Sequence, residues 1–545
     1  MEIVRKVCEL EISLREWQKE RLNEAKNALE TKKILLLNAP TGAGKTLFVL
    51  LLGKELGKKI LFLTRTHSEF EPVTREAKRL GLKMGYLFGK NSVCPYASKD
   101  IKPEEIDCKA CELKDSFRDL SGLTPSQILQ ISRTASDFCP YYSLKSMISE
   151  ADVIAASYLY FFDPNLRRTI VCNHEGCLKP SELMVVVDEA HNLISADEWF
   201  SLEISKKSAE GALEEVAEVE EKTKSDLTSV KDFLNQLIGF FNSLNKTDSC
   251  KELPLYPQPS PKTLIQMHNA IKAYLNMTTG PIKRSHLRAI YRFYNTDGDV
   301  FNCEGKLVVI PSNVQKLINN AFNRVNMVVL MSGTLPVMNL DGYKIDVDLK
   351  IGKPEYYYCN HVTSIHKFRP INAPKYAEII KKVHKQSPSN VLVYFPSYDF
   401  KDEVRKYLVG IPILEENRRV THEEILSLMK DGMYAVLLVI NAKESEGIEF
   451  RDESKNLFND LILAGLPYPD ISDDLVIRKI KTLSDLTKRE EQEVVHELIR
   501  IKIKQTIGRA FRDPNDYVKV YLCDRRYREY FQDLGLEERD AKLFA

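Results

Sequence analysis

The sequence predicts an α/β protein in which two parallel-sheet domains follow one another and the first carries two insertions. Three observations support this fold class. Eight short apolar runs occur in two sets of four, small or polar residues follow each run, and a break near residue 345 separates the sets. Apolar runs of this length are typical of buried parallel strands whose C-terminal ends carry loops. Two sets in tandem therefore indicate two α/β domains.

In chain order, the expected strands are Ile34–Leu37, Ile60–Leu63, Met184–Val187, Met327–Leu330, Val391–Phe395, Ala435–Ile440, Leu461–Leu463 and Val518–Leu522. Two stretches interrupt the first set. Residues 86–142 hold four cysteines without strong periodicity, and residues 203–283 show helical spacing of Leu and Phe on both sides of a proline-rich loop. The expected boundaries are 1–85, 143–202 and 284–344 for the first domain, 86–142 and 203–283 for the insertions, and 345–545 for the second domain.

The composition excludes several classes of protein. Hydrophobic residues make up 43% and charged residues 28% of the chain, as in soluble globular proteins. No apolar run approaches the roughly 18 residues of a membrane helix, and the start, MEIVRK, lacks the apolar stretch of a signal peptide. We therefore expect an intracellular protein, cytoplasmic in a prokaryote, with no membrane partner. With a net charge of +1, any affinity for nucleic acid must come from local basic grooves.

A glycine-rich octet, Ala39–Thr46, follows the first expected strand and precedes a predicted helix. Gly42 and Gly44 would let backbone N–H groups turn toward phosphate oxygens. Lys45 would bring a charge to the β and γ phosphates, and the Thr46 hydroxyl can hold Mg²⁺. Ala39 replaces the first glycine of the general pattern. A glycine-rich turn without a ligand is the alternative, but the position between a strand and a helix favours nucleotide binding.

Two adjacent acids, Asp188 and Glu189, follow the strand at Met184–Val187 and begin the string Asp-Glu-Ala-His191. At the end of a strand the carboxylate of Asp188 can reach the metal. Glu189, one residue further on, can orient or deprotonate the attacking water. The same string could begin a surface helix, but the strand and the phosphate loop before it favour a hydrolytic site.

Arg509 and Arg512 lie three residues apart at the predicted start of a helix in the second domain. Both can face the γ phosphate held by the first domain, so that bound ATP would sense whether the cleft is closed. Two solvated arginines are the alternative. Gln505 and Gly508 at matching offsets favour the ATP site.

The segment Pro281–Tyr294 alternates basic and aromatic residues and includes Arg288 and Arg292. This composition suits a surface that follows phosphates and stacks on nucleobases. It suits equally well a helix whose basic, aromatic surface docks on the first domain. The sequence leaves both interpretations open.

The cysteine-rich unit contains Cys94, Cys108, Cys111 and Cys139. Four thiolates can hold a 4Fe-4S cluster or a tetrahedral Zn²⁺. Most zinc sites show two close pairs, whereas this unit has a single Cys-x-x-Cys and a proline after its last cysteine. The pattern therefore favours the cluster only slightly.

The remaining cysteines carry weaker signals. Eleven cysteines in an intracellular chain favour free thiols and metal ligands over disulfides. Cys172, His174 and Cys177 could form part of a metal site, but without an identifiable fourth ligand a plain loop is favoured. Packing is expected for Cys8, Cys250, Cys303, Cys359 and Cys523.

The order of these strings resembles the superfamily-two helicases, and among them the XPD-like iron–sulfur DNA helicases of the Rad3 branch. The matching motifs span nearly the whole chain and are Arg15-x-x-Gln18, Ala39–Thr46, Thr64–His67, Asp188–His191, Ser332–Thr334, Phe395–Ser397, Glu446–Ile448, Gly465–Pro469 and Gln505–Arg512. So many ordered motifs are specific. The segment Asn441–Glu446 is more acidic than the family pattern, which suits a divergent archaeal paralogue.

The resemblance implies two RecA-like domains, the first carrying an Fe-S domain and an arch domain, that use ATP to move 5′ to 3′ on single-stranded DNA. The residues it implies for the nucleotide are Arg15, Gln18, Thr41, Gly42, Ala43, Gly44, Lys45, Thr46, Glu446 and Gly447. Catalysis would fall to Lys45, Thr46, Asp188, Glu189, Gln505, Arg509 and Arg512. The residues expected along the DNA are Thr64, Arg65, Thr66, His67, Tyr158, Tyr160, Ser332 and Thr334, together with Arg288 and Arg292. Cys94, Cys108, Cys111 and Cys139 would hold the 4Fe-4S cluster.

The leading hypothesis is an ATP-dependent 5′ to 3′ DNA helicase that acts as a monomer on single-stranded and tailed or forked duplex DNA, in repair. One alternative is a relative of the DinG or Chl1 branches, against which the short helical insertion argues. Another is an ATP-dependent switch that clamps strands or junctions without unwinding them. A third, an iron–sulfur redox protein with a vestigial motor, conflicts with the intact ATP residues. The sequence names no protein partner.

Overall fold

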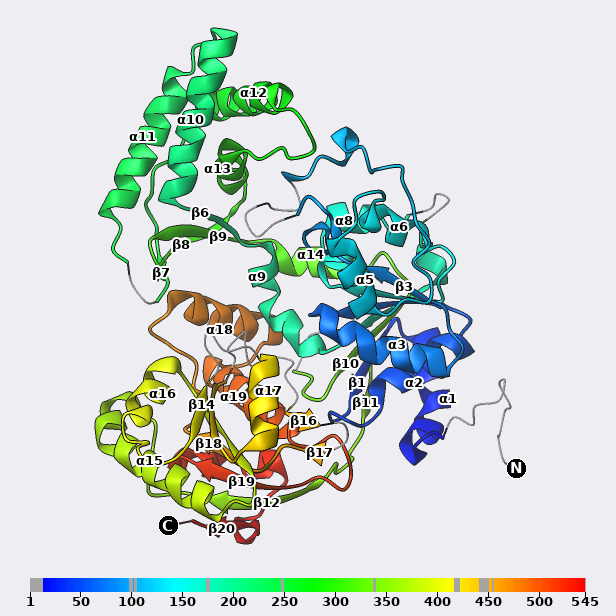
Figure 1. Cartoon of the computed structure of the whole chain (residues 1–545), viewed down its shortest axis with the longest axis vertical. Helices are drawn as coiled ribbons and strands as arrows, with labels where there is room; N and C mark the ends of the chain where they lie inside the picture. Colours follow the sequence, from blue (N-terminus) through cyan, green and yellow to red (C-terminus); the bar gives the residue numbers. More distant parts are fainter. Residues whose placement is uncertain are drawn as a thin grey trace.

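The computed structural model describes residues 13–97, 101, 105–172, 177–246, 249–336, 340–415, 422–440, 450–452 and 455–544. Two α/β domains, a cysteine-rich unit and an arch of helices are distinct in Figure 1. None of the described helices combines the length and the apolar character that crossing a membrane requires.

The first domain is built on a sheet of seven strands in the order β11-β1-β10-β5-β2-β4-β3, with every neighbouring pair parallel. The strands are β1 (Ile34–Asn38), β2 (Lys59–Thr64), β3 (Met84–Leu87), β4 (Val153–Ser157), β5 (Leu183–Val187), β10 (Met327–Ser332) and β11 (Tyr343–Asp346). The helices of this domain are α1 (Glu16–Thr31), α2 (Lys45–Glu55), α3 (Phe70–Arg79), α7 (Leu159–Phe162), α8 (Pro164–Arg168), α9 (Ala196–Phe200) and α14 (Val314–Phe322). β5 is buried at every position, as expected of a strand covered on both faces. All four strands predicted for this domain are confirmed.

The second domain repeats this design with the strand order β14-β15-β13-β18-β19-β12-β20, again parallel throughout. Its sheet strands are β12 (Lys353–Tyr358), β13 (Asn390–Phe395), β14 (Ile413–Glu415), β15 (Ala435–Val439), β18 (Phe458–Ala464), β19 (Tyr517–Cys523) and β20 (Ala541–Leu543), and a small hairpin joins β16 (Arg451–Asp452) to β17 (Lys455–Asn456). Its helices are α15 (Arg369–Gln386), α16 (Tyr398–Arg405), α17 (His422–Asp431), α18 (Asp474–Thr487) and α19 (Glu491–Gly508). The predicted fold class is confirmed.

The cysteine-rich unit lies between β3 and β4 and has little regular structure. Its helices are α4 (Lys90–Val93), α5 (Pro125–Arg133) and α6 (Pro140–Ser146). Leu120, Ile128 and Phe138 form a small core that rests on Phe70 and Phe88 of the first domain. A unit with so few apolar side chains of its own depends on its neighbours or on a bound group for stability.

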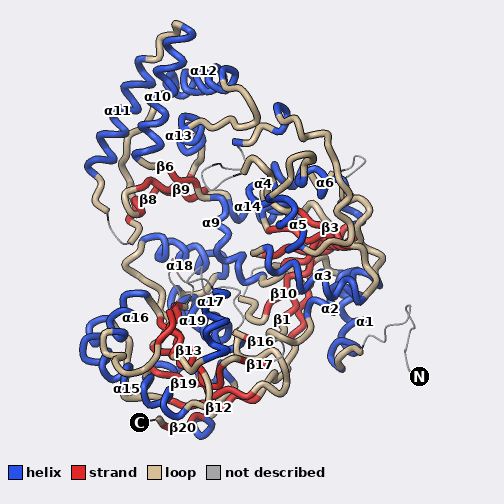
Figure 2. Tube along the Cα trace, in the orientation of Figure 1, coloured by secondary structure: helices blue, strands red, loops and turns tan. Residues whose placement is uncertain are grey.

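The arch consists of four helices on a small antiparallel sheet, which Figure 2 shows at the foot of the helices. The helices are α10 (Lys206–Thr223), α11 (Thr228–Ser243), α12 (Pro261–Met277) and α13 (His286–Tyr294), and the strands, in sheet order, are β6 (Leu202–Ile204), β9 (Lys306–Pro311), β8 (Gly298–Cys303) and β7 (Lys251–Glu252). Residues of α13, β8 and β9 share one core with α10 to α12. This packing carries the arch past the expected boundary at residue 283, as far as Pro311.

Candidate functional site

The glycine-rich loop connects β1 to α2, as the sequence predicts. Gly42 has a φ of +78° and Gly44 of +86°, backbone conformations that favour glycine. A side chain at Gly44 would also lie 2.8 Å from Nε2 of Gln18. Lys45 begins α2, and its Nζ donates to the carbonyl oxygens of Ala39 (3.0 Å) and Pro40 (3.3 Å). The loop is thus curled around its own lysine, and the first turn of α2 directs unpaired N–H groups to the loop side.

Helix α1 braces this loop. The Gln18 side chain, which is 2% exposed, donates through Nε2 to the carbonyl of Gly44 (2.9 Å) and accepts through Oε1 from the backbone N–H of Arg15 (2.8 Å). Trp17 donates through Nε1 to the carbonyl of Ala43 (3.1 Å). Here Gln18 therefore positions the loop, and both Gln18 and Arg15 line the cleft beside it.

The two acids sit at the carboxyl end of β5. The backbone N–H of Asp188 continues the sheet by donating to the carbonyl of Leu63 (2.9 Å). Glu189 has a φ of +43°, a left-handed conformation that is uncommon outside glycine and that turns its carboxylate toward the next strand. Burial and the neighbouring Glu189 carboxylate raise the pKa of Asp188. Burial alone would raise the pKa of Glu189 as well, but His191, Lys45 and Ser332 outweigh it and lower that pKa.

Ser332 links the acids to the end of β10. Its Oγ donates to Oε2 of Glu189 (3.1 Å), lies 2.9 Å from Nδ1 of His191, and accepts from the backbone N–H of Thr334 (3.1 Å). His191 Nδ1 is also 3.2 Å from Oε2 of Glu189. The serine and the histidine therefore hold the Glu189 carboxylate in place on two sides.

The second domain reaches this network through Gln505. Its Nε2 lies 2.7 Å from Nε2 of His191 and donates to Oγ1 of Thr334 (3.3 Å). If the amide donates to the histidine, the ring is neutral and carries its proton on Nδ1, facing Glu189. One amide of the second domain thus contacts two residues of the first domain, one that follows β5 and one that follows β10.

The backbone around the two arginines also meets the glycine-rich loop. A side chain at Gly42 would lie 3.0 Å from the carbonyl oxygen of Arg512, and one at Gly508 would lie 3.7 Å from Oγ1 of Thr41. The sequence placed the arginines at the start of a helix, which is wrong: α19 ends at Gly508 and Arg509 is its C-cap. A helix that ends here lets the chain turn across the loop.

These residues line one cleft of about 1810 Å³ between the two domains. The expected site residues around it are Arg15, Gln18, Thr41, Gly42, Gly44, Lys45, Thr46, Arg65, Thr66, Asp188, Glu189, Thr334, Gln505, Arg509 and Arg512. Ala43 and Ser332 are fully buried just behind it. Glu446 and Gly447 lie outside the described residues.

The residues expected along a DNA strand differ in exposure. Arg65 is exposed, and its guanidinium lies 3.5 Å from Oδ1 of Asn192. Thr64 is fully buried, and the ring of His67 packs between Phe70 and Phe88. Of Thr64, Arg65 and His67, Arg65 is the residue whose side chain is exposed.

Tyr158 and Tyr160 are 4% and 3% exposed. Their hydroxyls donate to the carbonyls of Asp188 (2.5 Å) and Phe88 (2.8 Å), respectively. A role for these tyrosines along a strand would therefore be to support the surface rather than to stack on a base.

A basic cluster that motif reading missed joins the domains near Arg65. Lys479 of α18 donates to Oγ of Ser195 in the first domain and lies 3.8 Å from Oε1 of Glu198. Burial lowers its pKa even though Glu198 and Asp197 oppose this, and Arg65 adds to the lowering. Burial and Lys479 lower the pKa of Lys502 in α19 to about 8. No acceptor for the Lys502 amine is found among the described residues. These lysines give no signal in the sequence, because only the fold brings Lys502 near Lys479 and Lys479 near Arg65.

Arg288 and Arg292 lie on α13, whose apolar face, formed by Leu287, Ile290 and Phe293, is buried in the arch core. The N-terminus of this helix is capped by the carboxylate of Glu215, which accepts from the backbone N–H of His286 (2.6 Å) and of Leu287 (3.1 Å). The helix docks on the arch itself, so the expected alternative of docking on the first domain is wrong.

The four cysteines of the small unit are free and share one neighbourhood. Burial raises the pKa of Cys94 and Cys139, and the other thiols of the group raise it further. Backbone N–H groups of Tyr141 and Tyr142 point to the sulfur of Cys139, as is common around cluster ligands. The donor set therefore fits a cluster in chemistry. In the described part of the chain, however, no three potential ligands converge closely enough to hold a metal ion.

The preference for free thiols over disulfides is wrong for four cysteines, and so is the expectation of packing alone for Cys250 and Cys303. Cys172 bonds to Cys177 and Cys250 bonds to Cys303. Spacing could not reveal the second pair, because its members are 53 residues apart and meet only when β7 aligns with β8. His174 lies outside the described residues, as does Cys8. Packing is observed for Cys359 and Cys523, which are fully buried.

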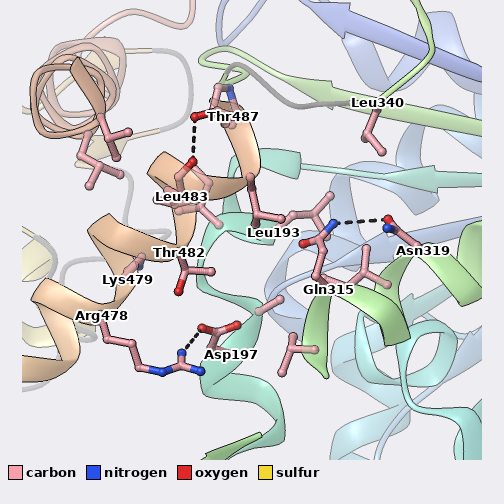
Figure 3. Close-up of a pocket in the computed structure, with 18 of the residues that line it drawn as sticks. Leu193, Asp197, Gln315, Asn319, Leu340, Arg478, Lys479, Thr482, Leu483 and Thr487 are labelled. Carbon is pink, nitrogen blue, oxygen red and sulfur yellow. Dashed lines mark hydrogen bonds and ion pairs between the residues drawn. The ribbon is translucent and has the colours of Figure 1, made fainter. Parts of the chain in front are cut away.

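A second cavity, of about 230 Å³, lies at the contact between the domains (Figure 3). Leu193 and Gln315 face it from the first domain, and Thr482 and Leu483 of α18 face it from the second. Below it, Arg478 of α18 pairs with Asp197 of α9 at 2.7 Å. An interface that combines an unfilled apolar space with a few ion pairs can shift more easily than a close-packed core.

Family models match most of the chain. They describe the arch domain of the DNA repair helicase XPD (residues 202–311), a helicase C-terminal domain (380–534), DEAD_2 (62–209) and the res subunit of type III restriction enzymes (11–92). The ATP-dependent DNA helicase XPD of Sulfolobus acidocaldarius is 31% identical over 554 residues, covering 96% of this chain and 98% of that protein. The chain belongs to the XPD helicase family.

Solved structures agree with this assignment. S. tokodaii Xpd4 matches with a TM-score of 0.81 and 42% identity, over 97% of this chain and 100% of that one. An XPD helicase matches with a TM-score of 0.79 and 28% identity, over 98% and 100%. The Chl1 helicase of Kluyveromyces lactis is more distant, at 24% identity over 86% of this chain and 70% of that protein. The XPD type expected from the motifs is confirmed.

Proposed function

We propose that this XPD-family helicase hydrolyses ATP between its two domains and uses the cycle to move 5′ to 3′ along single-stranded DNA and part a duplex, in DNA repair. The observation that carries the proposal is the contact of both domains with one network: Gln505 reaches His191 and Thr334 from across the cleft. A single chain contains both halves of the site, so a monomer suffices. A DNA substrate also implies an intracellular place of action.

The chemistry of hydrolysis would fall to residues of the first domain. Lys45 would exchange its two carbonyl partners for the β and γ phosphates of ATP. The Thr46 hydroxyl and Asp188 would hold Mg²⁺, which when bound neutralises charge on the phosphates. Glu189 has a lowered pKa and is therefore a carboxylate near neutral pH. It can orient the attacking water while Ser332 and His191 hold it.

The second domain would supply the charge that makes hydrolysis depend on closure. Arg509 and Arg512 border the cleft beside the glycine-rich loop. Arginines brought to the γ phosphate from a second domain stabilise the transition state only when that domain is in place. The contact around the 230 Å³ cavity is loosely packed, which would let the domains reopen after hydrolysis.

The strand would cross the basic cluster of Arg65, Lys479 and Lys502. The amine of Lys502 is half-buried and has no acceptor among the described residues. Its burial costs free energy unless an anion binds it. Phosphates of a nucleic acid backbone would supply that anion. Because Arg65 belongs to one domain and the lysines to the other, closure would change the grip on the strand.

The four cysteines would hold a 4Fe-4S cluster that staples the small unit. The unit has only a small core of its own, so a cluster would contribute directly to its stability. A rigid unit beside the arch could then part the duplex. Its role would be structural.

The test is separation of a tailed duplex in the presence of ATP, with iron measured on the same sample. We expect separation of a duplex with a 5′ single-stranded tail, little activity on a 3′ tail, and none with the Lys45→Ala variant. Strand-stimulated ATP hydrolysis without separation of either duplex would instead indicate an ATP-dependent clamp on DNA.

A further inference from the structure

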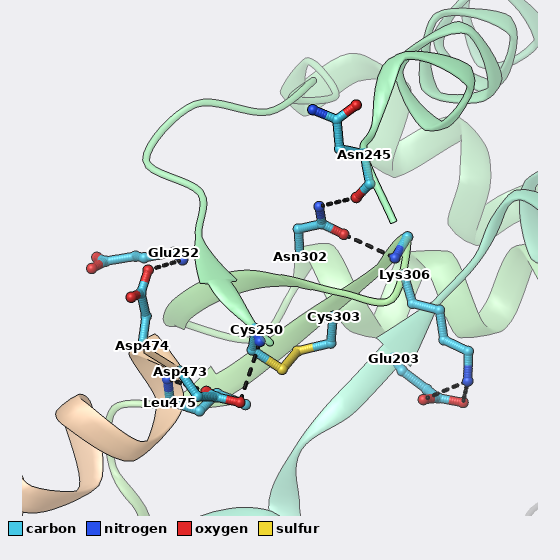
Figure 4. Close-up of a disulfide and its surroundings, with 11 residues drawn as sticks. Glu203, Asn245, Cys250, Glu252, Asn302, Cys303, Lys306, Asp473, Asp474 and Leu475 are labelled. Atoms are coloured by element: carbon cyan, nitrogen blue, oxygen red, sulfur yellow. Dashed lines mark hydrogen bonds and ion pairs between the residues drawn. A yellow bond between two sulfur atoms is a disulfide. The ribbon is translucent and has the colours of Figure 1, made fainter. Parts of the chain in front are cut away.

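The base of the arch contacts the second domain, although the arch is inserted in the first. Cys250 and Glu252 meet Asp473 and Asp474 at the start of α18 (Figure 4). The backbone N–H of Glu252 donates to Oδ2 of Asp474 (2.9 Å), and the backbone N–H of Asp474 donates to the carbonyl of Cys250 (3.0 Å). Lys251 Nζ donates to the carbonyl of Ser472 (2.6 Å) and lies 3.2 Å from Oδ1 of Asp474.

The side chain at the helix N-cap adds to this contact. Asp473 caps α18 by accepting from the backbone N–H of Leu475 (2.8 Å), and its other oxygen accepts from the backbone N–H of Cys250 (3.3 Å). The N–H groups and the ammonium of the arch strand thus face two carboxylates at one helix end. The contact is specific in geometry and complementary in charge.

The strand that makes this contact is held to β8 by the disulfide, by its short pairing and by a hydrogen bond from the backbone N–H of Leu253 to the carbonyl of Val300 (2.8 Å). β7 has two residues, both exposed, and it forms the edge of the arch sheet through Lys251 opposite Asn302 and Glu252 opposite Phe301. A two-residue edge strand is marginal without further support. The bond from Cys250 to Cys303 lies next to this pairing and joins the strand covalently to β8.

The arch meets the cysteine-rich unit at a different place. The backbone N–H of Asp107 donates to the carbonyl of Pro281 (2.6 Å), and that of Lys283 donates to the carbonyl of Glu105 (2.6 Å). Ile106 and Ile282 form an antiparallel bridge between these bonds. The arch therefore spans from α18 of the second domain to the cysteine-rich unit.

We propose that strand β7, fixed by the Cys250–Cys303 disulfide, is a latch that fastens the arch to α18 and passes movements of the second domain to the arch. This inference rests on the proposed function, because that function supplies the movement. Closure of the domains displaces α18 relative to the first domain. With the latch formed, the arch moves with α18. This movement also shifts the contact between the arch and the cysteine-rich unit. Without the disulfide, the short pairing of β7 with β8 can open and much of the movement is lost, while the ion pair between Arg478 of α18 and Asp299 of β8 (2.6 Å) stays as a second contact with the arch.

The first test measures the latch without any helicase assay. Hydrogen exchange is followed in the full-length protein for segments 249–253 and 472–476. The Cys250→Ser, Cys303→Ser double variant removes the bond, and Cys172→Ser, Cys177→Ser is its control at the other disulfide. We expect exchange in both segments to rise about tenfold in the first variant only. Unchanged exchange at 472–476 would overturn the latch.

The second test breaks the contact and keeps the disulfide. Lys251→Glu places a carboxylate against Asp474, and Lys272→Glu makes the same charge change on an exposed part of α12. Lys251→Glu and the double cysteine variant should both slow separation of a 5′-tailed duplex about fivefold, with strand-stimulated ATP hydrolysis within about twofold of wild type. Separation at the wild-type rate in both variants would refute the transmission role. If the wild-type protein separates no duplex, the proposed function fails, and hydrogen exchange still decides whether the latch exists.

Discussion

Glu189 shows how a single residue is shaped by the site. Its left-handed backbone costs roughly 1–2 kcal/mol for a residue other than glycine. The contacts with Ser332 and His191 offset that cost and fix the carboxylate. Strain of this kind at the end of a strand is typical of functional positions. The sequence predicted the acid, and the structure adds the two groups that hold it.

Lys502 predicts that the affinity for a DNA strand depends on pH. With a pKa of about 8 in the free protein, its amine is charged below pH 8 and neutral above it. A bound phosphate favours the charged form and raises that pKa. Strand affinity is therefore full below pH 8 and falls as the pH rises through 8 toward the pKa of the bound form.

Strand binding at pH 7 and pH 9 therefore tests Lys502. The affinity of the wild type should fall about tenfold more over this range than that of Lys502→Met. Lys481→Met, an exposed lysine on α18, serves as the control and should behave as wild type. Parallel pH profiles for Lys502→Met and wild type would remove this lysine from the strand path.

Among individual residues, the sequence predicted those whose chemistry depends on spacing along the chain. Lys45, Asp188 and Glu189 lie in short strings at the ends of apolar strands, and the structure brings them to one cleft. The sequence could not predict that the side-chain amide of Gln18 donates to the carbonyl of Gly44. Lys479 and Lys502 were missed because they sit on helices that only the folded protein brings close to one another, with Lys479 near Arg65.

At the scale of elements, a run of large apolar residues decided what could be predicted. β4 is buried and interior to its sheet, but its sequence VIAAS contains two alanines and a serine, and it was missed. The expected strands are central and apolar, whereas β11 and β20 lie at or near sheet edges and carry polar residues that hide their pattern. β7 is two residues long and depends on a disulfide. No local pattern could have revealed it.

The cysteine-rich unit provides a prediction for an element. If a cluster staples it into a rigid wedge, Cys111→Ser should abolish duplex separation and leave strand-stimulated ATP hydrolysis within about twofold of wild type, because the ATP residues lie elsewhere. Iron content, duplex separation and ATP hydrolysis are measured on one preparation. Duplex separation retained by a variant without iron would contradict the wedge.

Helix α13 provides a second prediction at the scale of elements. Arg292 is exposed and Arg288 is half-buried on the side of α13 away from its apolar face. If this side follows a strand, the loss of affinity with salt should be less steep for Arg288→Ala, Arg292→Ala than for wild type, by about one to two in the slope of log K against log salt. Binding measured from low to high salt decides this, and equal slopes would exclude α13 from the DNA path.

The whole molecule is organised around contacts that cross domain boundaries. Gln505 reaches across the large cleft between the domains, Arg478 pairs with the first domain beside the apolar cavity, and Lys251 reaches from the arch to α18. Motif order predicted the first of these crossings, because the strings must meet to act. The other two depend on surfaces that carry no motif. All three would change when the domains move.

The central claim is that the ATP site belongs to both domains, and ATP hydrolysis by arginine variants tests it most directly. Arg509→Ala and Arg512→Ala should each lower strand-stimulated turnover by about 10³-fold while ATP binding stays within a few-fold of wild type. Arg539→Ala, an exposed arginine of the second domain that pairs only with Glu537 among the described residues, should hydrolyse ATP normally. Turnover at the wild-type rate in both cleft variants would contradict a site shared between the domains.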